Sequence, residues 1–381
     1  MKLIPRDTDV ILGGSDLEPL YKFVRFPVFM GCTVSPQGTD LLSDMAWSIS
    51  RTSGAIQLNP VLPLEAIYPE AHGSGCVGRL WEVHHKSFAL FVSRFGPNGV
   101  LEIGGAHGIL SREFAELNPS VSWTIVEPNP MPVDGVTAKF IKGFFDEKFS
   151  LEFPIDTVVH SHVFEHVYDP VVFVKHISAF LEPGKHLVFS LPNMEEMLRR
   201  KYNNCINFEH TIFLTEPYVE YLLQSYGFRL IEKEYFLDDH SLFYAYVRDP
   251  QVRPTELPAS LYERNKRLYL DYVGYHEALI KDLNEKISNL SPDQDLYLFG
   301  AHVFAQYLIG FGLNTSRIKY ILDNDPSKQG KRLYGTSLEV ASPRILREVE
   351  NPVVILKAGV YNNEIRKDIT SLINPRCLFW D

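Results

Sequence analysis

The residues with the clearest capacity for chemistry form a turn of small side chains, Val100-Leu-Glu-Ile-Gly-Gly-Ala-His-Gly108. An apolar strand ends in this turn and a helix begins after it. Small residues let a ligand approach the backbone, and the first turn of a helix offers free N–H groups. The next predicted strand ends at Glu127, where a carboxylate can accept hydrogen bonds from both hydroxyls of a ribose. This pattern predicts a nucleoside-containing ligand.

The spacing of the glycines distinguishes two such ligands, a dinucleotide and S-adenosylmethionine (SAM). The dinucleotide fingerprint G-x-G-x-x-G/A, counted from Gly104, requires a small residue where this chain has Ile109. The pattern E-x-G-x-A-x-G instead resembles motif I of the class I SAM-dependent methyltransferases. A tight turn in a ligand-free sheet is the alternative. The resemblance implies that SAM is bound by Glu102, Gly104, Gly105, Ala106, Gly108 and Glu127.

Two later segments also follow strand ends, where ligands bind in open α/β sheets. Ser161-His-Val-Phe-Glu-His-Val-Tyr-Asp-Pro170 resembles the EHV-x-DP segment of many small-molecule methyltransferases. It implies His162 in the SAM pocket and His166 facing the substrate, although His166 could instead be a helix-start histidine bonded to backbone. Phe144 and Phe145 follow the third strand, where an adenine ring usually stacks; either could equally belong to the core.

The elements that position these residues alternate between strand and helix. Such alternation predicts βαβ units, with a parallel sheet covered by helices on both faces. We therefore expect an α/β protein of three domains: a small, loop-rich β unit, a Rossmann-like SAM-binding methyltransferase domain, and a smaller α/β domain after a Pro-rich linker. The predicted boundaries are 1–75, 76–250 and 251–381.

Composition limits the cellular context. The chain has 381 residues, is 45% hydrophobic and carries a formal net charge of -10, which argues against nucleic acid or an anionic membrane as the main partner. The first residues do not resemble a secretory signal, and no apolar run is long enough to span a membrane. The cysteines, which form no C-x-x-C pair, favour free thiols in a reducing cytoplasm. They are Cys32, Cys76, Cys205 and Cys377.

Three further stretches narrow the resemblance. Residues 204–214, NCINFEHTIFL, and the C-terminal segments DNDPSKQG and VYNNEI resemble the sugar C-methyltransferases, which methylate nucleotide-linked ketosugars. This resemblance implies that His210 is the catalytic base, polarised by Glu209, and that Tyr68 and His166 contact the sugar or its enolate. A structural ion pair or loop hydrogen bond is the alternative for Glu209 and His210.

The chain departs from this family at its "YHEH" segment, where Asn207 replaces the tyrosine and Phe208 the first histidine. Asn207 is a candidate for substrate binding, but an amide has no proton to exchange at neutral pH. Methylation of carbon and of oxygen therefore both remain open. Alternatives to the sugar methyltransferase are an O- or N-methyltransferase of another small metabolite and a non-catalytic protein that binds SAM or a nucleotide sugar.

The family's zinc module, built on two C-x2-C pairs, is reduced here to Cys32, Ser35, Ser50 and Ser53. Because a serine hydroxyl is a poor zinc ligand, we predict no structural zinc and no other metal.

The C-terminal domain contains a second nucleotide-binding-like start at Gly300-Ala301-His302, followed by Asp323. A single glycine makes a second dinucleotide site unfavourable. Lys328 and Arg332 could meet a phosphate, but the preferred interpretation is a solvated surface pair.

Overall fold

The structure is a computed structural model that describes residues 2–68, 78–237 and 240–381. It divides into two compact units, each made of several chain segments. Unit 1 comprises Met1–Glu18, Ser48–Met197 and Glu209–Asn265, and unit 2 comprises Pro19–Trp47, Leu198–Phe208 and Lys266–Asp381. The predicted three-domain boundaries remain a prediction, and Cys76 lies outside the described residues.

Unit 1 contains a seven-stranded sheet of order β10-β11-β9-β8-β5-β6-β7. Strands β5 to β9 pair in parallel, and β11 pairs antiparallel with both β9 and β10. This parallel-rich sheet confirms the predicted Rossmann-like α/β class. The strands are β5 (Gly99–Ile103), β6 (Ser122–Glu127), β7 (Lys139–Lys142), β8 (Thr157–Ser161), β9 (His186–Pro192), β10 (Phe228–Phe236) and β11 (Ser241–Arg248).

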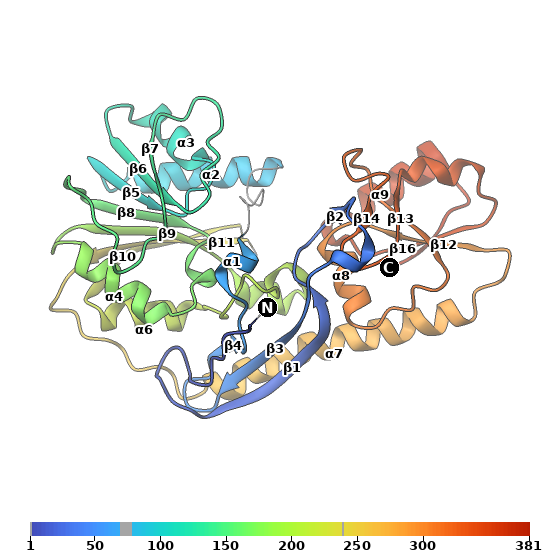
Figure 1. Ribbon diagram of the computed structural model, residues 1–381, viewed down its shortest axis with the longest axis horizontal. Helices are drawn as coiled ribbons and strands as arrows, with labels where there is room; N and C mark the ends of the chain where they lie inside the picture. The colour runs from blue at the N-terminus through green and yellow to red at the C-terminus, as the bar shows by residue number, and fades with distance from the viewer. Residues whose placement is uncertain (1, 69–77, 238–239) are drawn as a thin grey trace. The chain divides into compact units, whose positions relative to one another are not determined.

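Helices cover both faces of this sheet, as Figure 1 shows. Successive strand residues point to opposite faces, so Val100 and Val159 pack under α2 (Arg79–Ser93) and α3 (Ile109–Leu117). Their neighbours Leu101 and Val158 pack under α4 (Pro170–Phe180) and α6 (Glu216–Ser225). Apolar residues on both faces explain why the central strands are continuous hydrophobic runs.

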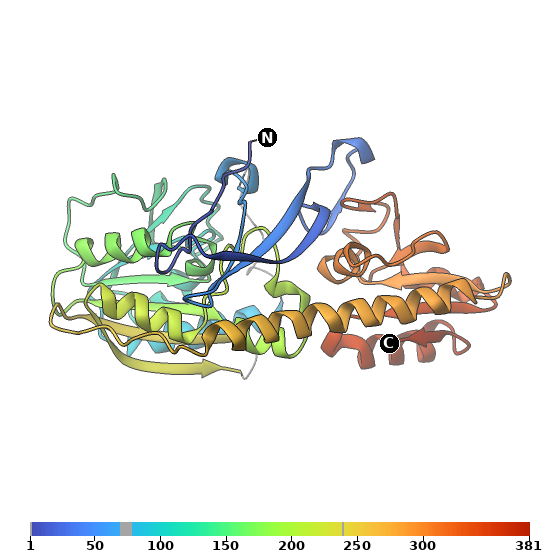
Figure 2. The same cartoon turned by 90° about the horizontal axis from the view of Figure 1, so that it is seen from below.

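Unit 2 contains a five-stranded parallel sheet of order β15-β13-β12-β16-β17. Helix α7, unbroken in Figure 2, and helix α8 contribute apolar side chains to one face, and α9 contributes to the other. The elements are α7 (Leu261–Ser288), β12 (Asp295–Phe299), α8 (Val303–Gly310), β13 (Ile318–Leu322), β15 (Val340–Ala341), β16 (Pro352–Leu356), α9 (Asn362–Asp368) and β17 (Leu378–Trp380).

The N-terminal segment forms strands, as predicted. β1 (Leu17–Pro27), β3 (Leu42–Ser50) and β4 (Ile56–Leu58) make one three-stranded sheet. β2 (Cys32–Thr33) instead pairs with β14 (Arg332–Leu333) inside unit 2. The N-terminal residues are therefore distributed between the two units.

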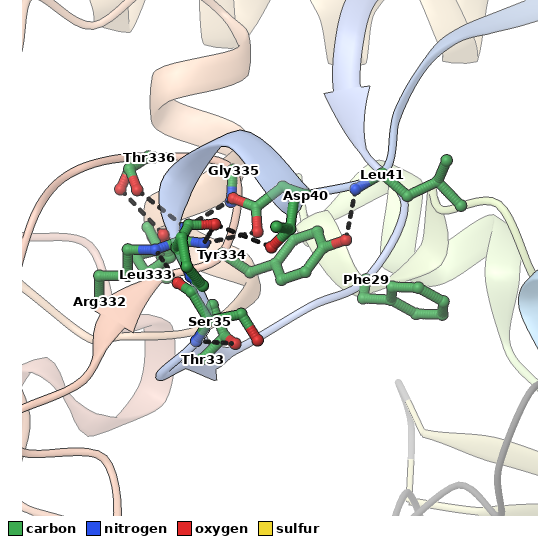
Figure 3. Close-up of polar contacts among 12 residues, drawn as sticks. Phe29, Thr33, Ser35, Asp40, Leu41, Arg332, Leu333, Tyr334, Gly335 and Thr336 are labelled. Atoms are coloured by element: carbon green, nitrogen blue, oxygen red, sulfur yellow. Dashed lines mark hydrogen bonds and ion pairs between the residues drawn. The ribbon is translucent and has the colours of Figure 1, made fainter.

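The expectation that Arg332 belongs to a solvated surface pair is wrong. Its guanidinium makes a two-point ion pair with Asp40, at 2.6 and 2.7 Å, and the two side chains are only 11% and 4% exposed (Figure 3). Arg332 also donates to the backbone carbonyls of Ser35 and Pro36. Lys328 pairs with Asp323 at 3.0 Å. These contacts hold the β2 segment against β14.

The described cysteines behave as thiols. Cys32, Cys205 and Cys377 each donate from sulfur to a backbone carbonyl oxygen, which a disulfide sulfur cannot do. Among the described helices, none combines the length and apolarity that crossing a membrane requires.

Candidate functional site

The glycine turn after β5 has a backbone that larger residues could not adopt without strain. Gly104 and Gly108 have φ of +73° and +70°, in the left-handed region. A Cβ on Gly104 would lie 2.7 Å from Val163 Cγ2, and one on Gly105 would lie 2.7 Å from the carboxyl carbon of Glu102. The turn is therefore a tight, half-buried bend at the start of α3.

Glu127, at the end of β6, is bonded directly to this turn. Its Oε2 accepts the backbone N–H of Ala106 at 3.1 Å, and its Oε1 accepts that of Asn129 at 3.0 Å. Each carboxylate oxygen has a second lone pair with which to accept a hydroxyl proton. The predicted ribose-binding acid is thus held in a fixed orientation beside the turn.

Glu102 lies beneath the turn. Its side chain is buried and its Oε2 accepts the indole N–H of Trp123 at 2.7 Å. Burial, opposed by the hydrogen bond from Trp123, raises the pKa of Glu102 to about 7. A direct contact of Glu102 with the cofactor remains a prediction, whereas its contact with the floor of the turn is structural.

The two phenylalanines after β7 have different surroundings. Phe145 packs among other rings, with its centroid 4.5 Å from that of His176 and 5.6 Å from that of Phe180. Phe144 is 50% exposed. Of the two predicted adenine contacts, Phe144 is the ring with an accessible face.

The predicted catalytic residues come together in unit 1. Tyr68 follows helix α1 (Leu64–Ile67), and His166 ends the 3-10 turn Phe164–His166. The hydroxyl of Tyr68 lies 3.0 Å from His166 Nδ1, and Glu209 Oε2 lies 3.7 Å from the same nitrogen. The His166 and His210 rings have centroids 5.1 Å apart. Residues distant in the sequence thus form one polar cluster.

Glu165, which is fully buried next to His166, was not predicted from the sequence. Its Oε1 lies 3.6 Å from His166 Nε2 and 3.5 Å from His162 Nδ1. Burial opposes the positive charge of His166, but Glu165 and Glu209 outweigh it and raise the pKa of His166. The signal was present in the quoted segment, where a glutamate directly precedes the candidate histidine.

Asn129 connects the turn to this cluster and was also missed. Its backbone N–H donates to Glu127, and its side-chain amide donates to the carbonyl oxygen of Tyr68 at 3.2 Å. Asn129 therefore links Glu127 to the backbone of Tyr68, and the side chain of that same tyrosine reaches His166.

The two other predicted site residues, His162 and Asn207, belong to different units and have different hydrogen-bond partners. His162, with φ of +53°, has its Nε2 3.0 Å from Ser241 Oγ. Asn207 belongs to unit 2, where its amide donates to the carbonyl oxygen of Asn204 at 3.2 Å. The SAM-pocket role of His162 and the substrate-binding role of Asn207 both remain predictions.

Three of the residues at the positions of the family's zinc cysteines form hydrogen bonds within the protein. Ser50 Oγ lies 3.2 Å from Asp16 Oδ1, and Ser53 Oγ accepts the backbone N–H of Ala55. Cys32 donates to the carbonyl oxygen of Ala301 at 3.3 Å. These hydroxyls do not supply the thiolates that a zinc module needs. The absence of a structural zinc ion from this module therefore stays a prediction.

One protein family has a model that matches part of the chain. Residues 82–233 match the family model of a methyltransferase domain. No curated protein has a matching sequence.

Several solved structures are similar over part of the chain. An O-methyltransferase family protein from Burkholderia thailandensis is 11% identical, with a TM-score of 0.37; the match covers 45% of this chain and 57% of that one. The N-methyltransferase NodS from Bradyrhizobium japonicum is 17% identical, with a TM-score of 0.34, and the match covers 45% of this chain and 97% of NodS.

The glycine turn follows strand β5 of the unit 1 sheet, and Glu127 ends strand β6. Both lie within the residues that the family model matches. The chain therefore carries a methyltransferase domain, as the sequence predicts, in residues 82–233.

Proposed function

We propose that the protein transfers the methyl group of SAM to a small acceptor, a nucleotide-linked sugar, with His210 as the base. The observation that carries the proposal is that Asn129 bonds Glu127 to the backbone carbonyl of Tyr68, whose own hydroxyl lies 3.0 Å from His166 Nδ1. It joins a nucleoside-binding turn to a cluster of proton-transfer groups within one unit.

SAM suits the turn in shape and in polarity. Gly104 and Gly105 let the turn pack closely against Val163 and Glu102, where a Cβ would clash, and Glu127 offers acceptors to the ribose hydroxyls. The exposed ring of Phe144 provides a stacking surface for adenine. When bound, SAM supplies an electrophilic methyl group.

The cluster suits the acceptor half of the reaction. Methyl transfer requires alignment of a nucleophile and removal of one proton from it, which we assign to His210. Burial, and then the charge of Glu209, raise the pKa of Tyr68 well above its usual value, so Tyr68 remains a phenol that can donate a hydrogen bond. A protonated His166, with one N–H facing Glu165, donates from Nδ1 to the Tyr68 oxygen and leaves the phenol proton for a developing oxyanion.

The resemblance to sugar C-methyltransferases supports a nucleotide-linked ketosugar as the acceptor. For a carbon acceptor, His210 removes the proton alpha to the ketone, the enolate carbon forms the new C–C bond, and the electron pair of the breaking S–C bond remains on sulfur. A hydroxyl acceptor would use the same base without an enolate. Only the carbon reaction exchanges the alpha proton with solvent.

The test uses the full chain with a panel of nucleotide-linked ketosugars and mass spectrometry of the products. We expect SAM to bind in calorimetry, one methyl group to be added, and an alpha deuterium to wash out into water. His210→Gln should lower kcat by about 100-fold or more while SAM still binds. His186→Gln, a change at the start of β9, is the matched control and should retain wild-type kcat.

Failure to bind SAM at about 1 mM would contradict the proposal and favour a non-catalytic protein. Methylation without deuterium washout would contradict carbon transfer and favour an oxygen acceptor. Wild-type turnover by His210→Gln would exclude His210 as the base.

A further inference from the structure

Three histidines gather at the carboxyl ends of β8 and β9 in unit 1, outside the cluster assigned to proton transfer. His84 belongs to α2, His162 follows β8, and His240 directly precedes β11. One ring nitrogen from each lies within 4.8 Å of the others. Their distance in the sequence explains why no ligand spacing indicated them and why the sequence led to the prediction of no metal.

His84 is the member whose surroundings most need a ligand. It is fully buried, its Nε2 lies 3.0 Å from Ser190 Oγ, and its Nδ1 has no hydrogen-bond partner among the described residues. A buried polar atom without a partner is destabilising, by about 1–3 kcal/mol. Burial, and then the neighbouring histidines, lower the pKa of His84, so the ring is neutral, as a metal ligand must be.

The other two rings have partners of the kind that orient metal ligands. Ser241 Oγ lies 3.0 Å from His162 Nε2 and 2.7 Å from His240 Nδ1, and Glu165 Oε1 lies 3.5 Å from His162 Nδ1. Such hydroxyl and carboxylate contacts fix the orientation and tautomer of a ligating imidazole. The indole of Trp81 packs edge-on against the three rings, with centroid distances of 5.0 to 5.2 Å.

We propose that His84, His162 and His240 bind one divalent transition-metal ion, Zn²⁺ in preference, through three imidazole nitrogens, with a fourth position for water or a substrate oxygen. Imidazole is a favoured ligand of Zn²⁺, and three protein ligands with one open position is the usual form of a catalytic zinc site.

The geometry allows this with small movements. Zn–N bonds of about 2.0–2.1 Å in a tetrahedral site place the nitrogens about 3.3 Å apart, so the rings must close by roughly 1.5 Å at most. His162 would exchange one of its two polar contacts for the metal bond. Through Glu165, which also faces His166, the ion would border the proposed catalytic cluster.

The test measures metal directly on the purified full-length protein. We expect elemental analysis after dialysis to give about one zinc per chain, and Co²⁺ added to the metal-free protein to give the visible absorption of a tetrahedral site. His84→Ala should weaken Zn²⁺ binding by about 100-fold or more, and His240→Ala provides a second variant should His84→Ala fail to fold. His186→Ala, in the same unit, should bind like the wild type.

Glu165, His166 and His210 form the competing metal-capable group. His210→Ala separates the two, because it should retain the ion if the proposed ligands are correct. Loss of the ion in His210→Ala with retention in both His84→Ala and His240→Ala would overturn the proposal. So would a wild-type protein that binds neither Zn²⁺ nor Co²⁺ above the level of a non-specific surface. These readouts do not involve methyl transfer, so they stand apart from the test of the proposed function.

Discussion

The backbone N–H of Ala106 donates to Oε2 of Glu127 at 3.1 Å, so the glycine turn and the acid after the next strand hold each other in place. This contact joins the glycine turn, whose backbone would face the cofactor, to the carboxylate that would bind the ribose of the cofactor.

Glu127→Ala removes the ribose acceptor and the turn's support together. We expect the Kd for SAM, measured by calorimetry, to rise by about 10-fold to 100-fold, the range for lost hydrogen bonds to a charged group. Glu127→Gln retains one carbonyl acceptor and should lie between this variant and the wild type. Unchanged SAM affinity in Glu127→Ala would remove Glu127 from the site.

Gly104→Ala tests whether the turn needs glycine for its backbone or for the space beside it. The added Cβ would lie 2.7 Å from Val163 Cγ2, and the left-handed φ adds strain of about 1 kcal/mol. We expect a lower denaturation midpoint and weaker SAM binding. The double variant Gly104→Ala/Val163→Ala relieves the clash but not the strain. Its loss in free energy of unfolding should therefore be smaller than the sum of the losses of the two single variants. Simple additivity would contradict the clash.

The sequence predicted the sheet of unit 1 well because its strands are continuous apolar runs that end in small or polar residues. Val100 and Leu101 pack on opposite faces of the sheet. Because both faces are buried, consecutive residues of the strand are apolar, and this run can be recognised in the sequence. The glycine turn could also be predicted from the sequence, because backbone with a positive φ favours glycine.

The contacts that close the site could not be predicted in the same way. Asn129 reaches the carbonyl oxygen of Tyr68, and the three histidines meet across α2, β8 and β11, through packing that no local pattern encodes. The C-terminal turn shows the limit of motif reasoning. Ala301 donates to Asp323 as Ala106 does to Glu127, but there Lys328 lies 3.0 Å from the carboxylate and neutralises it.

Glu102→Gln tests the buried acid beneath the turn. The folded-state pKa of Glu102, raised to about 7, lies above its unfolded value, so its stabilising effect is complete below pH 4.5 and is lost as the pH rises through 7. Glutamine retains an acceptor for Trp123 and does not titrate. We expect the free energy of unfolding of Glu102→Gln, relative to wild type, to rise by up to about 3 kcal/mol between pH 4.5 and 8. Urea denaturation across this range measures the difference, and a constant offset would contradict the raised pKa.

The Asp40–Arg332 pair in Figure 3 is expected to stabilise the packing of the β2 segment within unit 2. Because both side chains are nearly buried, removing one partner leaves the other charge without its ion pair, and Arg332 then has only backbone carbonyl oxygens as partners. Asp40→Asn and Arg332→Met should each lower the free energy of unfolding by about 3–5 kcal/mol. The double variant should cost clearly less than their sum, because neither charge is then left alone.

The control is the exposed pair of Lys22 and Asp44, which lie 3.1 Å apart with side chains 52% and 42% exposed. Lys22→Met should cost no more than about 1 kcal/mol, since solvent screens this pair. Denaturation followed by circular dichroism gives all of these values. If Arg332→Met cost no more than Lys22→Met, the Asp40–Arg332 pair would not contribute to the stability of unit 2, and the pairing of β2 with β14 would have to rest on its backbone hydrogen bonds and apolar contacts alone.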